Sequence, residues 1–80
     1  MNKTIDNLRA ELVVVLEKYD LLYEDITVNA GRGEVAITFI RKFNTRLLQH
    51  FFRFLNEENI NYSSYFCTRA KRIKVLVNMP

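Results

Sequence analysis

The sequence has very little cysteine, proline or glycine, and it has no tryptophan. Cys67 is the only cysteine among 80 residues, so no internal disulfide can form. Such cysteine usage favours either a reducing compartment or a protein that is indifferent to redox conditions. Two glycines, one proline, 49% hydrophobic residues and 26% charged residues exclude a disordered tail and predict a globular domain.

Long hydrophobic runs are also missing. The longest apolar run near the N-terminus, residues 12–16, is too short for a signal peptide, and acidic residues flank it. No stretch approaches the roughly 20 apolar residues that a membrane span needs. We therefore expect a cytoplasmic protein without membrane association. Its 80 residues predict a single domain, 1–80, whose small core leaves a thin margin of stability.

Acidic residues are missing from the last part of the chain, where no Asp or Glu follows Glu58. Residues 1–30 carry three basic and six acidic residues, whereas residues 31–80 carry nine basic and three acidic ones. A charge split between the halves of a chain is a mild indication of an acidic partner.

Constellations for catalysis or metal binding are not apparent. One histidine, His50, and Cys67 make no zinc ligand set, and on the expected fold they lie on opposite sides of the sheet. Glu57 and Glu58 are adjacent on a helix end and point in different directions, which makes them a poor acid and base pair. The sequence predicts no catalytic residue, metal, cofactor or small-molecule substrate, and a protein that is not an enzyme.

Two helices are predicted from apolar residues spaced at the helical period. The first helix should run from about Thr4 to Leu22, and the second should start near Asn44 and end in the segment 56–59. The apolar stripe of the first helix is expected to hold Ile5, Leu8, Leu12, Val15, Leu16, Tyr19 and Leu22. A second, smaller apolar strip on the surface of this helix is expected to hold Ala10, Val14 and Leu21.

Two β-hairpins are predicted from cross-strand pairing of apolar residues. In the first, a turn at residues 31–32 pairs Val28 with Val35 and Ile26 with Ile37, and Gly31 supplies the positive φ. In the second, a turn at residues 69–70 pairs Phe66 with Ile73, Ser64 with Val75, and Tyr62 with Val77. These pairs are expected to lie on the inner face of the hairpin.

The element order αββαββ predicts an α+β two-layer sandwich. A four-stranded antiparallel sheet should have two helices on one face and the spatial strand order 3-4-2-1. This is a permuted ferredoxin-like arrangement, in which the first ferredoxin strand has moved to the end of the chain.

The last hairpin suggests a function as a small binding module. Its outer face is expected to present cations beside an aromatic ring, as in proteins that hold the bases and phosphates of RNA or DNA. A basic two-stranded ribbon entering the major groove of a duplex is a second possibility. The expected nucleic-acid-binding residues are Tyr65, Arg69, Lys71, Arg72 and Lys74, with an auxiliary cluster of Arg41, Lys42 and Arg46.

Two other interpretations stay open. Exposed Lys and Arg on strands also prevent edge-to-edge aggregation, so the basic hairpin is equally consistent with a plain solvated face. Alternatively, Ala36, Ile40 and Leu76 on the outer sheet face could form the interface of a homodimeric adaptor or regulator that acts on another protein.

Overall fold

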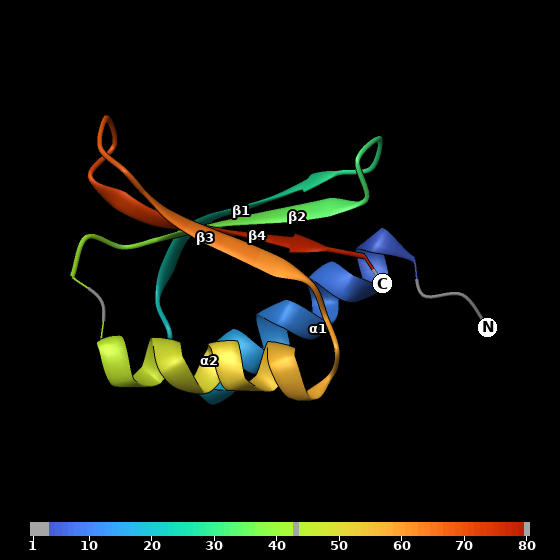
Figure 1. Cartoon of the computed structure of the whole chain (residues 1–80), viewed down its shortest axis with the longest axis horizontal. Helices are drawn as coiled ribbons and strands as arrows, with labels where there is room; N and C mark the ends of the chain where they lie inside the picture. The colour runs from blue at the N-terminus through green and yellow to red at the C-terminus, as the bar shows by residue number, and fades with distance from the viewer. Residues whose placement is uncertain (1–3, 43, 80) are drawn as a thin grey trace.

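The protein folds into a four-stranded antiparallel sheet with both helices on one face. The computed structural model describes residues 4–42 and 44–79, and Figure 1 shows the sheet above the helical layer. The elements are α1 (Ile5–Lys18), β1 (Tyr23–Asn29), β2 (Glu34–Phe39), α2 (Thr45–Glu57), β3 (Tyr62–Cys67) and β4 (Arg72–Asn78). Neither helix of the described part is long and apolar enough to cross a membrane.

Helix α1 is shorter than the sequence predicts. It is capped by Thr4, whose hydroxyl oxygen accepts a hydrogen bond from the backbone N–H of Asn7 at 3.1 Å. It ends at Lys18 rather than at Leu22, because Asp20 adopts the left-handed conformation with φ 55°.

Because α1 ends early, two leucines have the opposite burial from the one that the sequence predicts. The N–H of Leu21 donates to the carbonyl oxygen of Leu16 at 2.9 Å, which turns the chain back onto the helix. Leu21 is therefore buried at 5% exposure, whereas Leu22 is 66% exposed. The sequence placed Leu22 in the core stripe and Leu21 on the surface, and both predictions are wrong.

Helix α2 begins and ends as the sequence predicts. The side-chain oxygen of Asn44 accepts hydrogen bonds from the N–H groups of Arg46 and Leu47. At the other end, Asn59 takes φ 55° and the N–H of Ile60 donates to the carbonyl oxygen of Leu55 at 2.9 Å. The two helices therefore end in the same Schellman-type motif, one with aspartate and the other with asparagine in the left-handed position.

The strand order β1-β2-β4-β3 and the registers of both hairpins are those predicted. Val28 pairs with Val35 in the first hairpin, and Tyr62 pairs with Val77 in the second. The first turn differs in detail, because the positive φ of 61° belongs to Gly33 and not to Gly31. The turn spans residues 30–33, and its last residue makes the left-handed step back into the ladder.

The core lies between the sheet and the helices. Phe39 of β2 contacts Phe51 of α2 edge to face, with ring centroids 6.2 Å apart. No polar or charged residue of the described part is buried. The buried apolar residues are Leu8, Leu12, Val15, Leu16, Leu21, Val35, Ile37, Phe39, Leu48, Phe51, Leu55, Ile60, Val75 and Val77.

The two αββ halves are arranged as an internal repeat around the central strands β2 and β4. These strands pair antiparallel, and Ile37 lies opposite Val75, its counterpart in the other half. The turns 30–33 and 68–71 also correspond, and the second ends in Lys71 with φ 57° where the first has Gly33. One extra residue, the bulge residue Glu24 in β1, interrupts this correspondence.

Candidate nucleic-acid interface

The turn of the β3–β4 hairpin is held by hydrogen bonds of its own. The ladder ends at the pair Cys67–Arg72, and residues 68–71 form the turn. The N–H of Lys71 donates to the carbonyl oxygen of Cys67 at 2.7 Å. The Arg72 guanidinium donates to the carbonyl oxygens of Ala70 at 3.0 Å and Lys71 at 3.2 Å. Arg72 thus helps to close the turn, while Arg69 and Lys71 are exposed at its tip.

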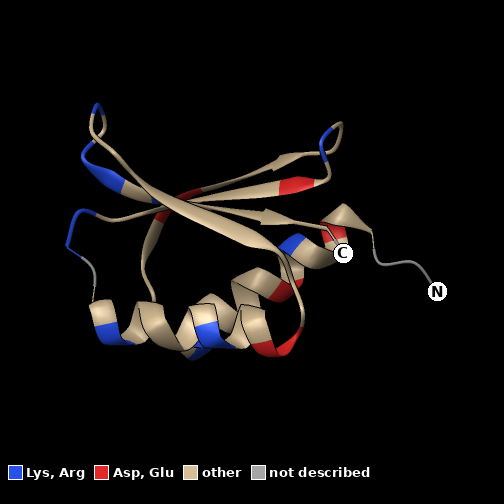
Figure 2. Ribbon diagram, in the orientation of Figure 1, with Lys and Arg blue, Asp and Glu red and all other residues tan. Residues whose placement is uncertain are grey.

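The two basic clusters of the sequence meet at one end of the sheet. Thr38 near the end of β2 lies opposite Lys74 near the start of β4, so the residues after β2 and those before β4 are neighbours. Figure 2 shows the Lys and Arg segments of the β3–β4 turn and of the β2–α2 connection on the same side of the molecule. We call this region the basic end; it comprises Arg41, Lys42, Arg46, Arg69, Lys71, Arg72 and Lys74.

An acidic side chain from the other hairpin reaches this region. The Nε of Arg72 donates to Oε2 of Glu24, the bulge residue of β1, in an ion pair. The Arg72 side chain is 22% exposed and that of Glu24 is 42% exposed. Arg72 is on β4 and Glu24 is on β1, so the pair spans the central strand β2 that lies between them. Arg72 is therefore partly neutralised, and the other six basic residues carry most of the net positive charge.

The β3–β4 hairpin carries two exposed aromatic rings. Tyr65 lies opposite Lys74 on the outer face and is 48% exposed, as the sequence leads one to expect. Phe66 was predicted to be in the core, but it is 57% exposed. Its partner Ile73 is only half-buried, whereas at the other end of β3 Tyr62 stacks on Phe52 of α2 with centroids 5.0 Å apart.

Phe66 is exposed because the turn end of its hairpin lies away from the helical layer. Helix α2 covers the end of β3 that holds Tyr62, whereas the turn end of the hairpin rises away from the helical layer (Figure 1). Since Tyr65 and Phe66 are consecutive residues of a strand, their rings point to opposite faces of the hairpin. The basic end therefore offers an aromatic surface on each face.

The residues expected to form a dimer interface are only partly brought together. Ala36 and Leu76 are direct neighbours across β2 and β4 on the outer face, and both are half-buried. Ile40 lies beyond the end of β2, where it lines a hollow of about 160 Å³ together with Leu22 and Leu47. The three residues do not form one patch.

The titratable residues His50 and Cys67 lie on separate elements. The His50 ring stacks on Tyr19 of α1, with centroids 6.0 Å apart and an interplanar angle of 20°. A hydrogen bond from the backbone of Ala70 lowers the pKa of the Cys67 thiol, and the positive charge of Lys74 adds to this effect. No three His, Cys, Asp or Glu residues within 4–42 and 44–79 gather closely enough to hold a metal ion.

Comparisons of the chain with protein-family models, with curated proteins and with solved structures found no match.

Proposed function

We propose that the protein is a cytoplasmic, non-enzymatic module that binds single-stranded RNA or DNA through the basic end. The observation that supports this most strongly is the meeting of two basic clusters, separated in the sequence, beside two exposed aromatic rings. Phosphate groups would contact Arg41, Lys42, Arg69, Lys71 and Lys74, and bases would stack on Tyr65 and Phe66. Cations beside aromatic stacking platforms are typical of single-strand binding without strong sequence preference.

A single strand suits this surface better than a duplex. Stacking on Tyr65 and Phe66 needs unpaired bases, because a paired base in a duplex offers only its edge. Arg72 contributes less than its neighbours in this proposal, since Glu24 already holds its guanidinium. Arg46 stays an auxiliary contact in the first turn of α2.

Titration of labelled single strands and of a duplex by fluorescence anisotropy tests the proposal. Binding should be stronger to single-stranded RNA or DNA than to the duplex and should weaken steeply with salt. Replacing Arg69, Lys71 and Lys74 together by Gln should lower the affinity. The slope of the logarithm of affinity against the logarithm of salt concentration should also become shallower, by about 0.7 for each phosphate that the variant no longer neutralises.

A matched variant controls for net charge. Replacing Arg9, Arg32 and Arg53 by Gln removes the same number of charges from exposed positions outside the basic end. This variant should keep most of the affinity and the salt dependence. The proposal fails if the protein binds no strand at low salt, and the site fails if both triple variants lose affinity equally.

The alternative function is a homodimeric adaptor that uses the outer sheet face. Its support is the contact between Ala36 and Leu76, which are neighbours on that face. Sedimentation at high protein concentration distinguishes the two functions. If the unmodified protein is a monomer and Leu76→Glu leaves the oligomeric state unchanged, the dimer is contradicted.

The order of the elements supports a more specific description of the fold. The element order αββαββ and the strand order β1-β2-β4-β3 are those of a ferredoxin-like sheet whose first strand has moved to the end of the chain. We propose this permuted ferredoxin-like description for the whole domain.

A further inference from the structure

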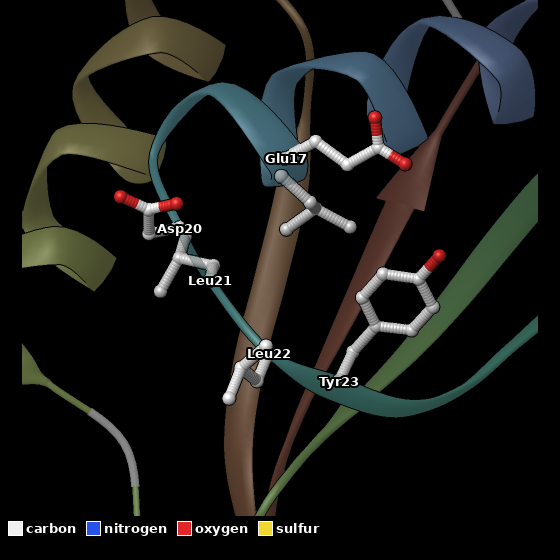
Figure 3. Close-up of a pocket in the computed structure, with 6 residues that line it drawn as sticks. Glu17, Asp20, Leu21, Leu22 and Tyr23 are labelled. Atoms are coloured by element: carbon white, nitrogen blue, oxygen red, sulfur yellow. The ribbon is translucent and has the colours of Figure 1, made fainter.

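A pocket lies where α1 ends and the chain turns into β1. It has a volume of about 370 Å³, close to the lower limit for sites that bind small ligands or single side chains. Figure 3 shows Glu17 and Tyr23 on one side of this pocket, Asp20 on the other, and leucine side chains between them. The lining residues are Leu16, Glu17, Asp20, Leu21, Leu22 and Tyr23.

The second half of the molecule provides an internal control for this pocket. Helix α2 ends in the same motif, and Asp20 and Asn59 share the same φ of 55°. The residue that corresponds to Glu17 is Asn56, and the one that corresponds to Leu22 is Asn61. Folding of this motif therefore requires neither the two carboxylates nor an exposed leucine, since the second half forms it with neutral amides.

The aromatic ring of the pocket also differs between the halves. Tyr62 in β3 is covered by Phe52, with ring centroids 5.0 Å apart and planes nearly parallel at 8°. The corresponding residue of α1 is Val13, which is too small to cover Tyr23 in the same way. Within the described part of the chain, no aromatic ring stacks on Tyr23, which packs half-buried against the core and also lines the pocket.

The electrostatics of the pocket favour a cation. Glu17 and Asp20 lie at the C-terminal end of α1, where the helix dipole is negative and acidic residues are unfavourable. Neither carboxylate has an ion-pair partner among the described residues. Lys18 lies over the Tyr19 ring at 5.7 Å and does not line the pocket. Lys42 lines the adjoining smaller hollow on the Asp20 side.

We propose that this pocket binds an arginine side chain presented by a partner protein. The aliphatic stem would lie on the leucines, and the guanidinium would meet Glu17 and the face of Tyr23, away from Lys42. Guanidinium is the better fit than ammonium because it is planar, weakly hydrated, and able both to stack on an aromatic ring and to pair with a carboxylate. This proposal does not depend on nucleic-acid binding at the basic end.

Titration with two blocked amino acids, followed by amide chemical shifts, tests the proposal. The first is N-acetyl-argininamide, and the second is N-acetyl-citrullinamide, which has nearly the same shape without the charge. Arginine should bind saturably with a dissociation constant on the order of millimolar and shift the amides of residues 16–23. Citrulline should bind at least about fivefold more weakly. Equal shifts with both compounds, or none at residues 16–23, would overturn the proposal.

Substitutions locate the site within the pocket. Glu17→Gln should weaken arginine binding by about fivefold, and Asp20→Asn should weaken it less. Glu57→Gln, the same chemical change in the last turn of α2, is the matched control and should bind like the unmodified protein. Unchanged arginine binding in Glu17→Gln, or an equal loss in Glu57→Gln, would contradict the assignment.

The stability of the same variants separates binding from a structural role. Removing either carboxylate from the negative end of α1 should leave the thermal midpoint unchanged or raise it. Asn also accepts a left-handed backbone readily, as Asn59 shows just after the end of α2. A lower midpoint in both variants would mean that the acids serve folding, and it would overturn the proposal.

Discussion

Cys67 is a sensitive reporter within the basic end. A hydrogen bond from the Ala70 backbone lowers the pKa of its thiol; burial opposes this effect, and the positive charge of Lys74 and the backbone and charge of Arg69 add to it. A lower pKa means more thiolate at neutral pH, and the thiolate is the form that reacts with alkylating agents. The rate of alkylation by iodoacetamide should therefore reach half its maximum at a lower pH than it does for free cysteine.

The pH profile of alkylation has two internal checks. Lys74→Gln should shift the midpoint upward, because the variant lacks one of the charges that stabilise the thiolate. A bound single strand should slow the reaction at every pH, since it would cover this end of the hairpin. A profile identical to that of free cysteine in the folded protein would contradict the environment described for Cys67.

Among the elements, the β3–β4 turn carries a strained residue where the β1–β2 turn does not. Lys71 has φ 57°, a conformation that costs a residue with a side chain about 1 kcal/mol or more relative to glycine. The equivalent Gly33 has φ 61° and avoids this cost. Lys71→Gly should thus raise the free energy of unfolding by about 1 kcal/mol in urea titrations.

The reverse substitution in the first turn should have the opposite effect. An added Cβ at Gly33 would meet the Cβ of Met79 at 3.7 Å, an ordinary contact, so the cost of Gly33→Ala is conformational. We expect it to lower the free energy of unfolding by about 1 kcal/mol. If Lys71→Gly also destabilised the protein, the strain assigned to Lys71 would be absent. Lys71→Gly should meanwhile weaken nucleic-acid binding, because it removes a cation from the basic end.

The pairing of the strands was predictable from the sequence because each hairpin has one register that buries its apolar residues. A slip by one residue would place Lys74 in the core, so the pattern around Val75 and Val77 permits no alternative. The end of α1 was not predictable from the apolar spacing. The helical period continues through Leu22, and only the left-handed turn at Asp20, a position that usually holds glycine, interrupts it.

Phe66 shows a second limit of pattern-based prediction. Its face of the strand was right, since it alternates with Tyr65 and pairs with Ile73. Its predicted burial was wrong, because alternation predicts the face of a sheet but not where that face rises away from the helices. The exposed ring that results is the part of the candidate site that the sequence did not indicate.

At the scale of the whole molecule, the basic end depends on the two αββ halves meeting through β2 and β4. The predicted strand order already implied that Arg41 and Lys42 lie near the last hairpin. The ion pair between Glu24 and Arg72 was not predictable, because it depends on the bulge that inserts Glu24 into β1. The chain thus carries an acid that moderates its own basic surface.

Glu24→Gln should remove the ion pair that partly neutralises Arg72. The free Arg72 guanidinium would neutralise about one further phosphate, so single-strand affinity at low salt should rise by roughly threefold and become more salt-dependent. Stability should change by less than about 1 kcal/mol, because the pair is partly exposed. Asp25→Gln, which removes an exposed acid of the same strand, is the control. Lower affinity in Glu24→Gln would mean that the ion pair positions the hairpin for binding.

The most direct test of the proposed function is a map of amide chemical shifts on addition of a short single-stranded oligonucleotide. The shifts should concentrate in residues 41–46 and 65–74, with side-chain shifts at Tyr65 and Phe66, and should disappear at high salt. Shifts spread evenly over the surface, or confined to α1 and the opposite turn at residues 30–33, would contradict binding at the basic end.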